Sequence, residues 1–243
     1  MIIMNRPSIS TIIVIICILI IGLYAAGKVN YFAHKTVTEK NITSPVVMVD
    51  KVGINEKMNN QSLDLGVMID EKSSIPTKGD VVIFGHRTLQ GSPFLRLNEL
   101  ENGDIITLEW PEVGEVNYSV TNKTIVPATY HLNVNETGNK VLLITCDPIG
   151  STENRLIIEG QRGNVSGIDE KIIHDNPQES NAWIISGAFL IVGLIISFVY
   201  PKESRPYILA TVLIISIILF YFCFNPISSQ AIYDKIIFMN GGM

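Results

Sequence analysis

Cysteine is scarce in this chain, with three residues among 243, at positions 17, 146 and 223. Cys17 and Cys223 fall within long apolar runs, so Cys146 is the one thiol of the polar middle region. A disulfide inside that region is therefore excluded, and so is a zinc site built from several thiolates. Cys146 is left either as a packed core residue or as a thiol with a chemical use.

Charged residues are also few, at 17% of the chain with a net charge of −5. Basic residues do not cluster between aromatic ones, as they do in proteins that bind nucleic acid. The sequence also lacks internal repeats and low-complexity tracts. The mild charge and the lack of a basic patch argue against a nucleic-acid partner.

Long apolar runs, in contrast, are abundant, and the mean hydropathy is +0.32. Three nearly uncharged segments cover residues 9–27, 182–200 and 207–224. Each is long enough to cross a hydrocarbon core of about 30 Å as a helix. The first could instead be a signal peptide, but its apolar part is long and Tyr24-Ala25-Ala26 is a poor cleavage site. We therefore expect three transmembrane helices, the first of them an uncleaved anchor.

The short connection between the second and third apolar segments contains Lys202 and Arg205, which favour a cytoplasmic side. Three spans then give a cytoplasmic N-terminus, consistent with Arg6, and place residues 28–181 outside the cell. The six Asn-x-Ser/Thr triplets of the chain all lie in that region, as glycan acceptors on an external face would. The expected localisation is a multi-pass cell-membrane protein with an extracytoplasmic domain.

The expected division of the chain follows from these spans. It comprises an anchor (1–27), a polar stalk (28–41), a globular domain (42–162), a tether (163–181), a helical hairpin (182–224) and a short tail (225–243). The globular domain has an ordinary single-domain length.

The globular domain has the pattern of an all-β fold. β-Branched and aromatic runs are separated by turn residues. We expect strands at 46–49, 65–69, 81–86, 104–110, 115–126, 140–146 and 155–160. One helix is expected at 93–100, from the spacing of its apolar residues. Strands of this number and length indicate a sandwich or a closed barrel.

A cysteine nucleophile needs a cation or a base nearby, because the thiolate is the attacking form. His86 follows an apolar run and so stands at a strand tip, as Cys146 does. Arg155 is the first residue of the strand-like segment that follows the loop after Cys146. Its guanidinium is permanently charged and donates several hydrogen bonds, so it is better suited to stabilising a developing oxyanion than to transferring a proton. His131 lies in a polar connection and is expected on the surface.

The segments GDVVIFGHR (79–87) and ITCDPIGSTENRLIIEG (144–160) resemble the two signature regions of the sortases, which are membrane-anchored cysteine transpeptidases. The family's second motif is Thr-Leu-x-Thr-Cys with an arginine on the next strand. Here Leu142 replaces the first threonine, and Thr145, Cys146 and Arg155 match. The resemblance covers roughly 46–160, and the hairpin at 182–224 is an addition to the common single-span plan.

This resemblance implies an eight-stranded β-barrel with short helices, with Cys146 as nucleophile, His86 as general acid/base and Arg155 as the oxyanion-stabilising cation. It implies cleavage of a sorting signal of the Leu-Pro-x-Thr-Gly kind and transfer of the acyl group to an amine. The partners would be surface-protein precursors that bear the signal and an amine of the cell envelope or of another protein. No cofactor is expected, since no acidic cluster matches the calcium sites of some members.

Two other functions remain open on sequence grounds. Water could resolve the thioester, which would make the protein a thiol endopeptidase. Alternatively, the barrel could be a non-catalytic membrane-anchored scaffold with a packed cysteine, which would resist alkylating reagents in the folded state.

Overall fold

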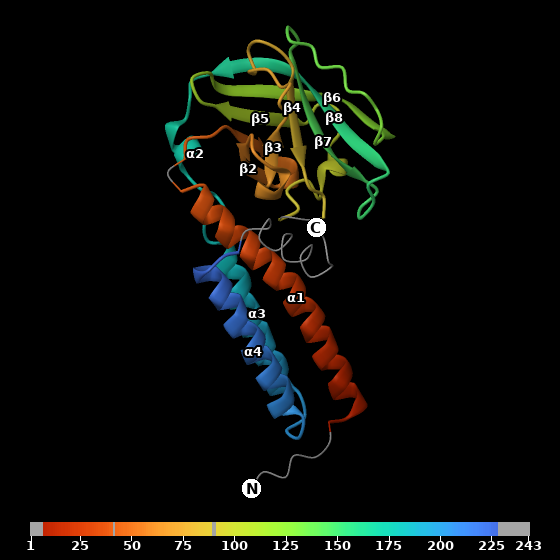
Figure 1. Ribbon diagram of the computed structural model, residues 1–243, viewed down its shortest axis with the longest axis vertical. Helices are drawn as coiled ribbons and strands as arrows, with labels where there is room; N and C mark the ends of the chain where they lie inside the picture. The colour runs from red at the N-terminus through yellow and green to blue at the C-terminus, as the bar shows by residue number, and fades with distance from the viewer. Residues whose placement is uncertain (1–6, 41, 89–90, 228–243) are drawn as a thin grey trace, which may run out of the picture. The chain divides into compact units, whose positions relative to one another are not determined.

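A computed structural model describes residues 7–40, 42–88 and 91–227. The chain divides into two compact units, one formed by 38–177 and the other by residues before 38 together with those from 178 onward. The first unit contains the β-strands and the second contains the long helices (Figure 1).

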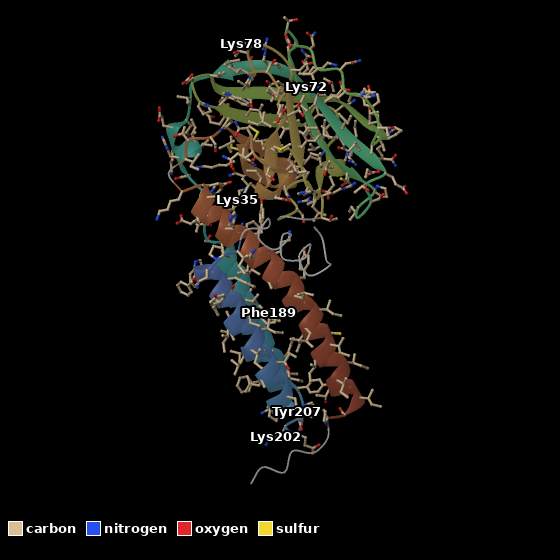
Figure 2. The ribbon with its side chains drawn as sticks, viewed as in Figure 1. Lys35, Lys72, Lys78, Phe189, Lys202 and Tyr207 are labelled. Carbon is tan, nitrogen blue, oxygen red and sulfur yellow. The ribbon has the colours of Figure 1, made fainter. Side chains whose placement is uncertain are left out.

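The helical unit consists of α1 (Ile9–Thr38), α3 (Asn181–Val199) and α4 (Arg205–Phe224). All three helices are long and apolar enough to cross a membrane. They run side by side (Figure 1), and Figure 2 shows Phe189 of α3 midway along them. α1 continues through most of the segment expected as a stalk, so the stalk is largely helical up to Thr38.

Small residues let these helices approach closely, as in other membrane bundles. A methyl group added at Gly193 of α3 would overlap Val212 of α4, and one at Gly22 of α1 would lie 2.7 Å from Ile215 Cγ2. The buried hydroxyls of Thr11 and Ser204 are hydrogen-bonded at 2.7 Å. The beginning of α1 therefore lies beside the α3–α4 connection.

The other unit is a closed barrel of eight strands, which confirms the expected all-β fold. The strands are β1 (Val46–Val49), β2 (Ile54–Asn59), β3 (Val67–Ile69), β4 (Val81–Gly85), β5 (Ile105–Trp110), β6 (Gly114–Pro127), β7 (Lys140–Asp147) and β8 (Asn154–Ser166). Around the barrel they follow the order β1-β2-β3-β4-β7-β8-β6-β5, and β1 closes the ring by pairing with both β2 and β5. β2–β3 and β4–β7 are parallel pairs.

Alternate side chains of the strands fill the barrel interior, as the two-residue period of a strand requires. Val81, Ile83, Val141, Leu143 and Ile158 are among these fully buried residues. A second apolar cluster lies on the outer face of β4, β7 and β8. It consists of Val82, Leu142, Ile144 and Ile157, packed against Phe84, Val126, Leu132 and Val134. The connection from β6 to β7 supplies the last two, and so covers this face.

Two expectations about local structure were wrong. The segment 93–100 forms turns and a short 3₁₀ helix at Leu97–Glu99 in place of an α-helix. β2, with the sequence INEKMN, was not expected as a strand, because its charged residues obscure the apolar alternation.

The segment expected as a tether is partly regular structure. β8 extends to Ser166, and a short helix α2 covers Glu170–His174. Most of the expected tail lies outside the described residues, as do residues 1–6 of the expected anchor.

Candidate active site

The ends of three neighbouring strands bring together the residues expected at the site. β4 and β7 are parallel, and their last ladder pair is Phe84 with Ile144. His86 lies two residues beyond Phe84, just as Cys146 lies two residues beyond Ile144. On the other side of β7, Cys146 is paired directly with Arg155 of β8. The three residues thus form a row across adjacent strand ends.

Strand alternation places Cys146 and Arg155 on the outer face of the barrel. Side chains two residues apart on a strand share a face, so Cys146 lies on the same face of β7 as Leu142 and Ile144. Arg155 likewise lies on the same face of β8 as Ile157. Leu142, Ile144 and Ile157 all belong to the outer cluster. Cys146 is a free thiol and partly exposed. The thiol is therefore not packed into the barrel core.

His86 directly follows β4 and is half-buried. Its backbone carbonyl accepts a 3.0 Å hydrogen bond from the amide of Phe94, which closes the loop after it. Burial lowers the pKa of His86 because it disfavours the charged imidazolium, and the negative charge of Asp64 acts in the opposite direction. Burial thus favours the neutral form of this imidazole.

Arg155 is held near the loop that joins β7 to β8. Its Nη1 donates to the backbone oxygens of Thr152 and Asn154, at 3.0 and 3.1 Å. Its next neighbour across the sheet is Val126 of β6. A guanidinium anchored in this way keeps further N–H groups available to a ligand on the outer face.

Three residues lie behind the row: Thr145 was expected only as a match to the family motif, and Arg87 and Asp147 were not recognised as part of the site. Arg87 is 5% exposed, and it donates from Nη1 to the carbonyl oxygen of Cys146 at 3.3 Å and to the carboxylate of Asp147. The buried hydroxyl of Thr145 donates to the carbonyl oxygen of Gly85 at 2.7 Å. The opposite charges at positions 87 and 147, each next to an expected site residue, were the sequence signal for this contact.

No group of three or more His, Cys, Asp or Glu side chains that could hold a metal ion occurs in the described part of the chain. His131 lies in the connection between β6 and β7 and is exposed, as expected. The arrangement suits chemistry by a thiol, an imidazole and a guanidinium. Such a set can attack a carbonyl carbon, move a proton and stabilise an oxyanion.

Comparison with protein families finds a match to the sortase domain over residues 36–163, just over half of the chain. Among solved structures, the barrel is similar to a sortase C of Clostridium perfringens with the C-terminal cell wall sorting motif. The identity is 24%, 49% of this chain and 69% of that chain are covered, and the TM-score is 0.44.

Sortase A of Listeria monocytogenes is 18% identical, with 55% of this chain and 99% of that chain covered and a TM-score of 0.46. The sortase D5 transpeptidase of Clostridium perfringens is 20% identical, with 54% and 87% covered and a TM-score of 0.45. No curated protein matches this chain.

Proposed function

The chain belongs to the sortase family, and we propose that it is a membrane-anchored transpeptidase in which Cys146, His86 and Arg155 perform the chemistry. The observation that supports this most directly is the row of these residues on adjacent strand ends, with Cys146 paired to Arg155. Each residue has a distinct task in acyl transfer.

Acylation begins when Cys146 loses its proton to the neutral imidazole of His86. The thiolate sulfur attacks the carbonyl carbon of the scissile peptide bond, and the negative charge moves to the carbonyl oxygen. Collapse of this tetrahedral intermediate breaks the C–N bond, and the imidazolium of His86 gives its proton to the departing amine. The acyl group is then held as a thioester on Cys146.

In the second half-reaction, an incoming amine attacks the thioester and His86 accepts the amine's proton. The new C–N bond forms and the C–S bond to Cys146 breaks. The imidazolium of His86 returns its proton to the departing thiolate, which regenerates the thiol and the neutral imidazole, so atoms and charges balance over the cycle. Arg155 stabilises the oxyanion in both steps, because its charge is permanent and its backbone partners fix its position.

The proposed substrates are surface-protein precursors with a Leu-Pro-x-Thr-Gly-like sorting signal. The acceptor is an amine of the cell envelope or of another protein. A peptide laid across the strand ends would meet Val126 next to Arg155 and Phe84 next to His86. Both side chains are partly buried and apolar, which favours a substrate with apolar residues near the scissile bond.

We further propose that the three candidate spans cross the membrane in turn, with the barrel (42–162) as an extracytoplasmic catalytic domain. The Thr11–Ser204 hydrogen bond supports a common side for the N-terminus and the α3–α4 connection. That connection includes Lys202, which Figure 2 labels, and Arg205 is the first residue of α4. Tethering favours the reaction, since it raises the effective concentration of enzyme for membrane-held precursors.

The test uses the full-length protein in detergent micelles, as wild type and as Cys146→Ala. Each is incubated with Leu-Pro-x-Thr-Gly-like peptides, with and without triglycine as the amine, and analysed by intact-protein and peptide mass spectrometry. We expect an acyl adduct on Cys146 in the wild type, and a triglycine-extended product when the amine is present.

The products distinguish the proposed function from its alternatives. A hydrolysed peptide with no triglycine product would indicate an endopeptidase resolved by water. A folded wild-type protein that forms no adduct with any peptide, and whose thiol also resists iodoacetamide, would indicate a scaffold.

A further inference from the structure

The backbone ladder between β4 and β7 stops before it reaches the residues of the site. Its last pair is Phe84 with Ile144, whereas His86 and Cys146 lie beyond it. From this point the two strand ends are joined by side chains. Thr145 donates to the carbonyl oxygen of Gly85 at 2.7 Å. The next connection along the strands is made by Arg87.

Arg87 contacts three parts of the site from one buried position. Its Nη1 donates to the carbonyl oxygen of Cys146 and forms an ion pair with Asp147. Its Nε lies 3.5 Å from the carbonyl oxygen of Leu95, on the far side of the loop that follows His86. Arg87 and Asp147 are 5% and 19% exposed, so solvent screens this pair only weakly.

We propose that Arg87 and Asp147 are a positioning pair for the transpeptidase reaction: together they fix the spacing between His86 and Cys146 and balance the charge beneath the nucleophile. This inference deepens the proposed function and rests on it for the roles of His86 and Cys146. Asp147 projects from the opposite face of β7 to Cys146, and Arg87 is buried, so the pair lies away from the outer face on which the proposed substrate would bind.

The pair affects the thiolate through two charges of opposite sign. If Arg87 is replaced by a neutral residue, the negative charge of Asp147 is left next to the nucleophile and disfavours the thiolate. If Asp147 is made neutral, the cation of Arg87 remains and favours the thiolate. The two substitutions should therefore shift the pH at which the Cys146 thiol ionises in opposite directions, whereas general structural damage would not produce opposite shifts.

Other charged or titratable groups lie around the ends of the same strands. They are His86 at the end of β4, Arg155 on β8 and, beyond His86, Asp64 of the β2–β3 connection. All three are unchanged in the variants below. A difference between the variants therefore reports on Arg87 and Asp147.

The experiment measures the rate of iodoacetamide alkylation of Cys146 against pH, in the full-length protein with Cys17 and Cys223 replaced by alanine. In Arg87→Met we expect the midpoint of this profile to move up, and in Asp147→Asn to move down, each by about one pH unit. The double variant should return close to the wild-type midpoint. Arg96→Met, which breaks the exposed ion pair with Glu99, is the matched control and should not move it.

Turnover of a signal peptide gives a second readout. Arg87→Met should lower kcat roughly 10- to 100-fold with little change in KM, because the nucleophile is displaced and the peptide surface is not. Arg87→Lys retains the charge and should keep the wild-type midpoint while recovering part of kcat.

Midpoints that move in the same direction in Arg87→Met and Asp147→Asn would overturn the proposal, as would shifts no larger than that of Arg96→Met. If Arg87→Met does not fold, Asp147→Asn decides the matter, and an unshifted midpoint would refute the proposal. Alkylation needs no substrate, so a failure of the proposed transpeptidase activity would be seen separately, as the absence of a peptide adduct.

Discussion

Gly85 offers a sharp test of how the barrel core supports the site. It lies between Phe84 and His86 at the end of β4, and it is buried. A Cβ added at Gly85 would lie 2.5 Å from Cδ2 and 2.7 Å from Cγ of the Phe94 ring. Phe94 is itself fully buried in the core, so its ring has no free space into which to retreat. Gly85→Ala should therefore strain the core directly beneath the site.

The size of the effect follows from the cost of overpacking. Inserting a methyl group into a well-packed core costs about 1–3 kcal/mol. For a domain of this size, 2 kcal/mol corresponds to a fall in Tm of roughly 5–10 °C. The Phe94 amide also holds the carbonyl oxygen of His86. Displacement of Phe94 should therefore slow the acylation of Cys146 as well.

The assay follows thermal unfolding of the full-length protein in detergent. The chain has two tryptophans, so in a Trp183→Phe background the fluorescence reports on Trp110 of the barrel. Gly167→Ala is the matched control, because a Cβ at Gly167 meets no atom within 4 Å. Phe94→Leu added to Gly85→Ala should restore part of the lost stability, since a smaller side chain relieves the overlap.

Two results would refute this reasoning. One is a Gly85→Ala protein with the same Tm as Gly167→Ala. The other is a double variant whose loss of stability equals the sum of the two single losses, because residues in contact should be coupled.

Three further predictions concern the site and the loop beside it. Arg155→Lys should lower kcat by about 10- to 100-fold with a smaller change in KM, because an ammonium group cannot reproduce the hydrogen-bond geometry of a guanidinium. Steady-state kinetics with a signal peptide would test this. The lowered pKa of His86 means that its contribution to stability is present above pH ~6.5 and is lost as pH falls through the folded-state pKa. Between pH 7.5 and 5.0, Tm should therefore fall less in His86→Asn than in wild type. An equal fall of Tm with pH in the two proteins would contradict the argument. The buried carboxylate of Asp80 accepts hydrogen bonds from the backbone amides of Asn135 and Lys140, each at 3.0 Å. Asp80→Ala should therefore lower the free energy of unfolding by about 2–3 kcal/mol. A fall in Tm of less than 2 °C would show that these hydrogen bonds contribute little.

Several features of the fold could be predicted from sequence because local pattern determines them. The three apolar runs have the length of membrane-spanning helices, and β7 and β8 are runs of β-branched and apolar residues. The segment 93–100 shows where pattern misleads. Phe94, Leu97 and Leu100 are all buried, but their spacing of three residues fits turns and a 3₁₀ helix as well as an α-helix.

β2 shows a different limit. Lys57 would be expected in solvent, yet it is 2% exposed and its Nζ donates to the carbonyl oxygens of Ile42 and His174. Those partners are distant in sequence and are supplied by the segments that enter and leave the barrel. A buried lysine of this kind is acceptable only when such partners exist, so its strand could not be recognised from local pattern.

The sequence by itself determined which residue types were available for chemistry: a single thiol outside the apolar runs, with a histidine and an arginine at the tips of strand-like segments. It did not determine that β4 and β7 pair in parallel, because their partners lie about sixty residues apart and the pairing depends on closure of the whole barrel. Only the tertiary structure placed Cys146 opposite Arg155 and beside the end of the His86 strand. It also decided the Arg87–Asp147 contact behind them, since an ion pair between a buried arginine and a partly buried aspartate depends on geometry that no local sequence pattern encodes.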